Sequence, residues 1–460
     1  MATNPVSSKL VELAPALSPG ARLLADNQDP AFTKLTHGWS NLNTQVPAAI
    51  LLPAVDEDVA AFVRFATANG IPFVPRSGGH GNTSSIDSRG VLLDLQQLDQ
   101  VKVDKERATV TFQSGVLSRA LLKACHDAGF VVPVGNCNGV GVVPFILGGG
   151  FTKLEGLLGP ACDSILECKV VLASGEIITV SETQHADLFW AMRGAGLYFG
   201  VTLELTVKLQ SFSLINRDDG MAWEGTLLFD PSQDTAVFSA WERLLADNDA
   251  NACGLIVMCC PPPAFQPILM AALVYLGDSK SAEHAYSELL SLPRLATQTI
   301  ELPFASINNS ADMFCVKGDF KAISGVALRR IDVVALRKSF AHYTAFVKAY
   351  PDAIMTCIGL RLQGRHPKLH PDNAFRHRDV LTWSEVIPWW KDAQINDAIQ
   401  AFMEEQNQIL RHDQGGVLAY DNFSRAMPAE CRYPGDGVLA RLHALKTDYD
   451  PTGVFTRQFL

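Results

Sequence analysis

The chain has 460 residues, of which 48% are hydrophobic, and a formal net charge of −10. This length predicts two or more lobes with sizeable cores, and no apolar run reaches the roughly 18 residues that a membrane span needs. The acidic balance argues against nucleic acid as a main partner.

Residues 1–45 are expected to form a leader of mixed helix and loop that ends in the polar run Trp39-Ser40-Asn41-Leu42-Asn43-Thr44. The start of the chain lacks the basic end, continuous apolar core and small-residue cleavage site of a secretory signal. The sequence therefore predicts an intracellular, cytoplasmic protein.

Between residues 46 and 209, strands rich in valine alternate with helix patterns, which predicts an α+β or α/β lobe. The expected helices and strands of this lobe are helix 55–69, strand 71–74, strands 91–95, 101–103 and 108–113, helix 117–128 and strand 165–172.

A second pattern occupies residues 210–415 and predicts a lobe in which a sheet is backed by helices. Its expected elements are strands 254–259, 268–275 and 354–362 and helices 281–290, 334–350 and 395–410. Residues 416–460 form the C-terminal segment.

A glycine-rich loop follows the first short strand and reads Pro75-Arg76-Ser77-Gly78-Gly79-His80-Gly81-Asn82. Its glycines can adopt φ > 0, so successive backbone N–H groups can converge on a pyrophosphate, and Arg76 adds positive charge. A plain structural turn remains the alternative for this motif taken alone.

Three other segments are informative in combination with that loop. They are Gly135-Asn136-Cys137 with Val140-Gly141-Val142 and Gly148-Gly149-Gly150, then the run from Arg193 to Thr202, and finally Tyr420-Asp421-Asn422 with the stretch from Arg441 to Phe455. In combination they resemble the vanillyl-alcohol oxidase and p-cresol methylhydroxylase superfamily, in its berberine-bridge-enzyme-like branch.

The resemblance implies an α+β fold with a p-cresol methylhydroxylase-type FAD-binding domain at residues 46–209. It further implies a substrate-binding domain at 210–415, built as an antiparallel sheet backed by helices. The leader 1–45 is then expected to pack on the FAD domain, and residues 416–460 to return to it.

The implied cofactor is FAD, bonded covalently through His80 to the flavin 8α-methyl group and through Cys137 to flavin C6. The alternatives are a His80 that only hydrogen-bonds the flavin and a Cys137 that remains a buried thiol. The residues expected to bind the cofactor are Arg76, Ser77, Gly78, Gly79, His80, Gly81, Asn82, Cys137, Val140, Gly141, Gly148, Gly149, Gly150, Gly200, Val201 and Asn422.

The other nine of the ten cysteines show no Cys-x-x-Cys pair of the zinc-site type. In a reducing compartment they are expected to be buried thiols rather than disulfides. No metal site is predicted.

The implied chemistry is hydride transfer from a substrate C–H bond to flavin N5, assisted by a base that takes a proton from an O–H or N–H group. Two positions depart from the family pattern, because Phe145 replaces a histidine and Phe151 a tyrosine, and neither can relay a proton.

The expected catalytic residues are therefore Tyr420, Arg361 and Gln363. The phenol of Tyr420 can act as the base if a nearby cation lowers its pKa, and the alternative is a core tyrosine packed by its ring. Arg361 and Gln363 lie two residues apart on one strand and share a face, which points them into the cleft or merely reflects surface alternation. His377 and Arg378 are interpreted as structural.

Val140 occupies a position where the resemblance associates valine with O2 as electron acceptor and H2O2 as product. We expect a small-molecule substrate from natural-product biosynthesis, with a carbohydrate as the second candidate. A non-redox cyclisation on the same fold and a plain binding protein complete the alternatives. Trp389-Trp390 and Phe320-Lys321 do not decide between these substrates, because aromatic residues are usually core.

Overall fold

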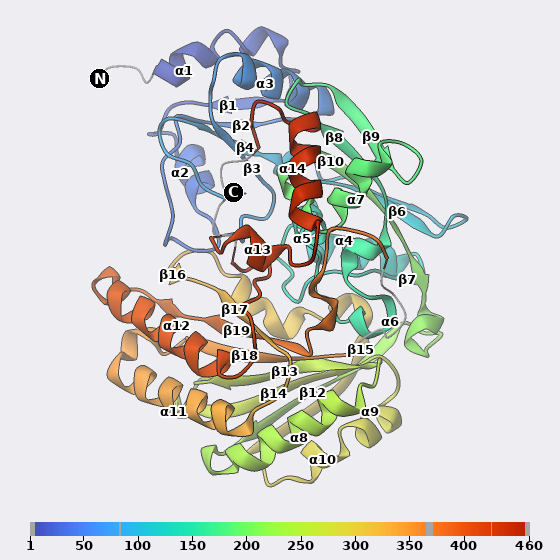
Figure 1. Ribbon diagram of the computed structural model, residues 1–460, viewed down its shortest axis with the longest axis vertical. Helices are drawn as coiled ribbons and strands as arrows, with labels where there is room; N and C mark the ends of the chain where they lie inside the picture. The colour runs from blue at the N-terminus through green and yellow to red at the C-terminus, as the bar shows by residue number, and fades with distance from the viewer. Residues whose placement is uncertain (1–4, 82–83, 365–370, 425, 456–460) are drawn as a thin grey trace.

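The computed structural model describes residues 5–81, 84–364, 371–424 and 426–455, which form two lobes (Figure 1). The first lobe combines two sheets with the helices around them, and the second is built on one large sheet. Within the described residues, no helix is both long and apolar enough to cross a membrane.

The first sheet of the upper lobe has the strand order β1-β2-β4-β3 and carries the glycine-rich loop at its end. Strands β2 (Ala49–Leu52), β4 (Val91–Asp94) and β3 (Phe73–Arg76) are parallel, with helix α3 (Asp56–Ala68) joining β2 to β3. β1 (Arg22–Leu24) pairs antiparallel with β2. Every residue of β2 and β4 is buried, as expected of parallel strands covered on both faces.

The second sheet is antiparallel throughout, in the order β5-β6-β10-β8-β9. Its strands are β5 (Val101–Asp104), β6 (Thr109–Gln113), β8 (Ile165–Val171), β9 (Ile177–Ser181) and β10 (Val201–Lys208). Buried and half-buried residues alternate along β6 and β9, so one face of this sheet packs on the core. The helices of this part of the lobe are α4 (Ser118–Asp127), α5 (Val142–Leu147), α6 (Glu155–Leu158) and α7 (Ala186–Ala195).

The second lobe is a seven-stranded antiparallel sheet in the order β15-β12-β14-β13-β18-β19-β17. Its strands are β12 (Met221–Phe229), β13 (Ala252–Cys259), β14 (Ile268–Tyr275), β15 (Ala296–Pro303), β17 (Ser324–Leu328), β18 (Cys357–Gln363) and β19 (Thr382–Ile387). Helices α8 (Asp234–Asp247), α11 (Val333–Ala349) and α12 (Asn396–Arg411) cover its outer face, and the inner face is turned to the first lobe (Figure 1).

The side chains of the central strands alternate between these two faces. Ile256 and Met258 of β13 and Ile358 and Leu360 of β18 pack in the hydrophobic core under the helices. The residues between them, such as Val257 and Gly359, line a cavity on the inner face. One face of the sheet therefore packs in the core of the second lobe, and the other face forms a wall of the cavity.

The C-terminal segment leaves the second lobe and returns to the first, where α13 (Ala429–Arg432) and α14 (Val438–Tyr449) lie against it (Figure 1). Leu442 and Leu445 of α14 belong to the same hydrophobic core as α7. Segments that are far apart in the sequence thus share one core.

The α+β class expected from the sequence is confirmed, and β14 has the predicted bounds. The helix expected at 281–290 is broken into α9 (Ser279–Ala285) and α10 (Ser287–Ser291). The break falls at Tyr286, whose ring is fully buried and whose hydroxyl donates to the carbonyl of Val274 at 2.7 Å. Burying that side chain outweighs the helix-forming tendency of its neighbours.

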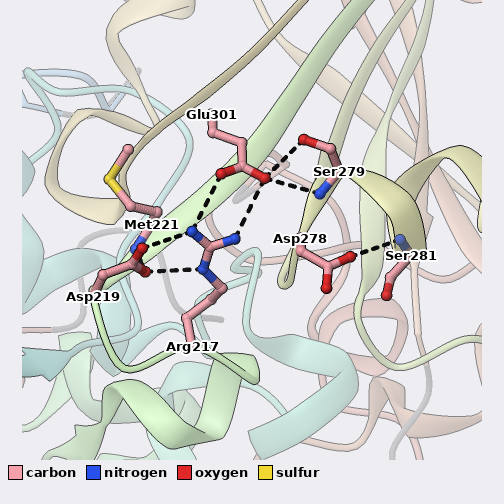
Figure 2. A network of polar contacts seen from close by, with 7 residues as sticks. All are labelled: Arg217, Asp219, Met221, Asp278, Ser279, Ser281 and Glu301. Carbon is pink, nitrogen blue, oxygen red and sulfur yellow. Dashed lines mark hydrogen bonds and ion pairs between the residues drawn. The ribbon is translucent and has the colours of Figure 1, made fainter.

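A polar network ties the edge of the large sheet to the turn before α9 (Figure 2). Arg217 pairs with Asp219 at 2.6 Å and with Glu301 of β15 at 3.2 Å. Glu301 also accepts hydrogen bonds from the backbone N–H and the hydroxyl of Ser279, at 2.9 and 2.7 Å. Three chain segments are joined through this one carboxylate.

Candidate functional site

A cavity of about 720 Å³ lies between the two lobes. Its lining comes from the glycine-rich loop, from residues 135–145 and 197–202 of the first lobe, and from β13, β14 and β18 of the second. Tyr420 and Asn422 of the C-terminal segment also line it. The volume falls in the upper part of the range of about 300–1,000 Å³ seen for small-molecule and cofactor sites.

The glycine-rich loop and the segment 137–141 interlock at the cavity wall. A Cβ on Gly78 would lie 2.5 Å from the carbonyl oxygen of Gly139 and 2.6 Å from the backbone nitrogen of Gly141. A Cβ on Gly141 would collide with the hydroxyl of Ser77. Only glycine at these two positions allows the two backbones to approach so closely.

Arg76 is buried beside the loop, and its positive charge is already paired. Its Nε donates to Asp94 Oδ2 at 2.9 Å, and its Nη2 forms an ion pair with the same oxygen. Its Nη1 is buried and has no hydrogen-bond partner among the described residues, and the same holds for Thr202 Oγ1. Both residues line the cavity, so these two polar atoms fit a site that receives a polar cofactor.

His80 lines the cavity and stacks on Trp39, with ring centroids 5.7 Å apart. Desolvation, together with the charges of Lys317 and Lys321, lowers the pKa of its imidazole to about 4. At neutral pH the ring is therefore uncharged and one ring nitrogen keeps a lone pair, as an attack on a flavin methyl group requires.

Cys137 also lines the cavity, but its sulfur is bonded to the sulfur of Cys315. The expectation that every cysteine other than Cys137 is an unpaired thiol is therefore wrong for Cys315. The remaining eight cysteines are free, as expected, and six of them are buried.

The other predicted cofactor residues fall into three groups. Those that line the cavity are Ser77, Gly78, Gly79, Gly81, Val140, Gly141, Gly200, Val201 and Asn422. Asn82 lies outside the described residues. The triple glycine Gly148–Gly150 is not among the described lining residues. A Cβ on Gly148 would collide with Asn422 of the C-terminal segment, and a Cβ on Gly149 would collide with Phe375.

Tyr420 is buried at the cavity wall and packs on Phe151, with ring centroids 4.0 Å apart. Its oxygen accepts hydrogen bonds from the backbone N–H of Gly150 at 2.9 Å and from Asn422 Nδ2 at 2.7 Å. Burial raises the pKa of the phenol. The cation Arg361 does act to lower this pKa, but burial outweighs it, so the condition set for Tyr420 to act as the base, a lowered pKa, is not met.

Arg361 and Gln363 take different places although they share a face of β18. Arg361 lines the cavity, pairs with Glu385 at 2.6 Å and lies over the ring of Phe151, 5.5 Å from its centroid. Gln363 is not among the described lining residues. It accepts from Arg361 Nε at 3.2 Å and donates to Glu155 at 3.4 Å.

Lys153 and Glu224 are two of the polar cavity residues that were not predicted from the sequence. Lys153 donates to the side-chain oxygens of Asn136 at 3.1 Å and Asn308 at 2.6 Å, and burial lowers its pKa to about 8. Glu224 of β12 accepts from the hydroxyl of Ser310 at 3.2 Å, and burial raises its pKa. The only sequence signal for Lys153 is its place three residues after the triple glycine.

His377 and Arg378 lie away from the cavity lining. A ring nitrogen of His377 is 2.8 Å from the carbonyl oxygen of Arg432, and Arg378 pairs with Asp163 at 2.7 Å. These contacts fit the structural role expected for them.

A family model described as an FAD binding domain matches residues 47–181. FAD-linked oxidoreductase hasG of Aspergillus fumigatus is 30% identical to this chain over 478 residues, which cover 99% of this chain and 98% of the relative. FAD-linked oxidoreductase fogF of Aspergillus ruber is 27% identical over 453 residues, covering 94% and 90% of the two chains.

Among solved structures, Physcomitrella patens BBE-like 1 superposes with a TM-score of 0.85 at 20% identity, covering 98% of this chain and 99% of the other. This likeness confirms the two-lobe fold. Because the match to hasG spans nearly the whole of both chains, the chain belongs to the FAD-linked oxidoreductases with a p-cresol methylhydroxylase-type, berberine-bridge-enzyme-like fold, and it is an enzyme that binds FAD.

Proposed function

We propose that this enzyme is an oxidase that takes a hydride from a C–H bond of a small, mainly apolar organic substrate and passes the electron pair to O2, forming H2O2. The observation that carries the proposal is the single cavity lined on one side by the flavin-binding loops and on the other by the inner face of the large sheet. FAD supplies the hydride acceptor, its N5 atom.

The residues proposed to hold FAD are cavity residues with polar atoms that have no hydrogen-bond partner within the described residues. Among the described residues that line the cavity, Arg76 Nη1 and Thr202 Oγ1 are the buried side-chain polar atoms without a hydrogen-bond partner. The backbone N–H groups of the loop at Gly78 and Gly79 supply further donors. His80 is proposed to bond the flavin covalently through its uncharged ring.

Lys153 is proposed to accept the proton that leaves the substrate. A neutral amine has two N–H bonds and one lone pair, and both hydrogen-bond partners of Lys153 are amide oxygens that can take up the two N–H bonds. The lone pair then remains for the substrate, and the lowered pKa makes the neutral form accessible near neutral pH.

Tyr420, Arg361 and Gln363 are proposed to orient the substrate rather than to deprotonate it. The raised pKa of Tyr420 keeps its O–H available as a hydrogen-bond donor. Arg361, fixed by Glu385, places a positive charge where negative charge develops on a substrate oxygen. Gln363 acts through its hydrogen bond to Arg361.

The cavity wall of the second lobe favours an apolar substrate over a sugar. Its lining there is dominated by Leu255, Val257, Met270, Ala272, Ile354 and Met355. Trp389 and Trp390, the aromatic pair that a sugar site might use for stacking, are not among the described lining residues, and Trp390 stacks on Phe320 instead. A natural product with an apolar skeleton fits this wall, and a carbohydrate is the second candidate.

The test is anaerobic mixing of the holoenzyme with two panels, one of hydroxylated polyketide- and alkaloid-like compounds and one of oligosaccharides. We expect loss of flavin absorbance with the first panel and, on admitting O2, one H2O2 for each product molecule. Product formed without loss of flavin absorbance would replace the oxidase with a non-redox cyclisation. Bleaching by the oligosaccharides alone would select the carbohydrate.

The oxygen step has its own test, because Val140 lines the cavity at the position proposed to admit O2. We expect rapid reoxidation of the reduced wild-type enzyme and slower reoxidation of Val140→Leu. Wild-type reoxidation no faster than that of free reduced flavin would remove O2 as the acceptor.

A further inference from the structure

The segment 308–315 of the second lobe is fastened to the flavin-binding segment 135–139. Asn308 Nδ2 donates to the carbonyl of Gly135 at 2.8 Å. Asn138 Nδ2 donates to Asp312 at 2.8 Å and to Asn309 at 3.1 Å. Hydrogen bonds from several residues therefore fix the position of Cys315 beside Cys137.

The two cysteines are bonded to each other, with their Cα atoms 6.3 Å apart, within the usual span of about 4.4–6.8 Å for a disulfide. His80 borders the same spot. A Cβ on Gly139 would lie 3.0 Å from His80 Nε2 and 3.8 Å from the sulfur of Cys315. The sulfur pair and the histidine thus lie at one end of the cavity.

We infer that Cys137 has two mutually exclusive partners, Cys315 and the flavin ring, and that the bond to Cys315 leaves the flavin attached through His80 alone. A cysteine sulfur carries one bond to its own Cβ and forms only one more. The inference rests on the proposed attachment through His80, but not on the proposed substrate or on O2 as acceptor in turnover.

Both fates of Cys137 are net two-electron oxidations: the disulfide takes the two electrons from the two cysteine sulfurs, and the flavin bond takes them from ring carbon C6. For the disulfide, a small-molecule disulfide is the oxidant: the Cys137 thiolate displaces one thiolate from it, and Cys315 then displaces the second, losing its proton to solvent. For the flavin bond, the thiolate adds at C6, a C–S bond replaces the C–H bond, the proton goes to solvent and the electron pair left on the ring passes to O2.

The test blocks free thiols with N-ethylmaleimide in denaturant, digests the holoenzyme and maps the peptides by mass. For wild type purified without reductant, we expect eight blocked cysteines, since two of the ten are bonded to each other. The Cys137 and Cys315 peptides should be joined by a reducible bond, and the mass of FAD should be on the His80 peptide alone.

Cys315→Ser is the informative variant. We expect its flavin to join the His80 and Cys137 peptides through bonds that reductant does not cleave. Val316→Ser is the matched control, because Val316 is the next residue and 55% exposed, and it should behave as wild type. If Cys315→Ser fails to fold, wild type expressed and purified in excess dithiothreitol and then supplied with FAD should carry the same second bond.

Two results would overturn the inference. One is wild type in which Cys137 and Cys315 are both blocked by the reagent or in which Cys137 carries flavin. The other is a folded Cys315→Ser enzyme whose flavin stays on His80 alone while Cys137 is blocked. Neither readout involves a substrate, so failure here leaves the proposed oxidase reaction standing, and failure of that reaction leaves these bonds measurable.

Discussion

Burial shifts the pKa values of several residues at the cavity, and Lys153 is the clearest example. Desolvation lowers its pKa to about 8, whereas burial raises that of Tyr420. As a result, the Lys153 ammonium loses its proton at a lower pH than the Tyr420 phenol does. When the environment separates the pKa values of two neighbouring groups in this way, the group with the lowered pKa is the better candidate for the base and the other for the acid.

We predict that Lys153→Met lowers the rate constant of flavin reduction by about 10²–10⁴-fold. In wild type this rate constant should rise about tenfold per pH unit up to a pKa near 8 and then level off, since only the neutral amine accepts a proton. The variant should lose that rise. The measurement is anaerobic stopped flow between pH 6 and 10 with a substrate found in the panels.

Lys153→Arg keeps the positive charge but removes the accessible neutral form, and it should be as slow as Lys153→Met. Lys348→Met, on an exposed position of α11, serves as the control. A Lys153→Arg enzyme with the wild-type pH profile would exclude Lys153 as the proton acceptor.

Glu155 provides a second prediction at this scale, this time about stability. Burial raises the pKa of its carboxyl to about 8, and its Oε2 has no hydrogen-bond partner among the described residues. Because the pKa of Glu155 is higher in the folded protein than in the unfolded chain, where it is about 4.5, the carboxyl group contributes its full stabilisation of the folded state below pH 4.5. This stabilisation is lost as the pH rises through about 8. Glu155→Gln should therefore gain stability relative to wild type as pH rises from about 5 to 8, measured by thermal unfolding.

The residues of the site were predictable where a backbone pattern required them. The loop Gly78–His80 and Gly141 are recognisable because close backbone approach leaves only glycine possible. Cys315 was not predictable, because its partner is 178 residues away and nothing local marks the pairing. Lys153 was not predictable either, because its withdrawal from solvent depends on Asn308 of the other lobe.

At the scale of elements, the sequence predicted best those whose pattern is uninterrupted. The helix expected at 334–350 appears as α11 (Val333–Ala349), and β14 matches residue for residue. Strands β12 and β15 were not predicted, since β12 carries Gly225 at its centre and β15 is largely exposed. β15 is the edge strand and has no buried alternation, so it resembles a loop in sequence.

At the edge strand β15 we predict a measurable effect on stability of the network in Figure 2. Hydrogen bonds from Ser279 and then the charge of Arg217 lower the pKa of Glu301. A lowered carboxyl pKa contributes stability above the unfolded value of about 4.5, and the contribution is lost as pH falls below it. Glu301→Gln should cost about 1 kcal/mol at pH 7 and less at pH 4.

Urea unfolding followed by tryptophan fluorescence at both pH values measures this cost. Glu283→Gln, on the exposed side of neighbouring α9, is the control and should unfold as wild type does. An equal loss of stability at pH 4 and pH 7 would show that the network acts through packing rather than charge.

At the scale of the whole molecule, the C-terminal segment is locked onto the first lobe by a buried charge. Arg432 pairs with Asp421 at 2.7 Å and donates to the hydroxyl of Tyr198 at 2.9 Å. Asp421 lies between two residues of the cavity wall, Tyr420 and Asn422. The ion pair therefore fixes the C-terminal segment against the first lobe and also fixes the part of the cavity wall formed by Tyr420 and Asn422.

We predict that Arg432→Met destabilises the protein by about 3–5 kcal/mol, because it leaves Asp421 buried without its charged partner. Adding Asp421→Asn to that variant should restore part of the loss. Arg330→Met is the control, since Arg330 and Asp413 form an exposed pair worth at most about 1 kcal/mol. Thermal unfolding and flavin release on heating give the two readouts, and a double variant no better than Arg432→Met would contradict the argument.

The lining of the cavity runs from Trp39, near one end of the chain, to Phe455, near the other. During synthesis the first lobe can begin to fold before the second has left the ribosome. The enclosure for the cofactor, however, is incomplete until the C-terminal segment has been made and has crossed back over both lobes. The covalent attachment of flavin proposed above would then follow the return of the C-terminal segment, because a truncated nascent chain lacks that part of the cavity wall.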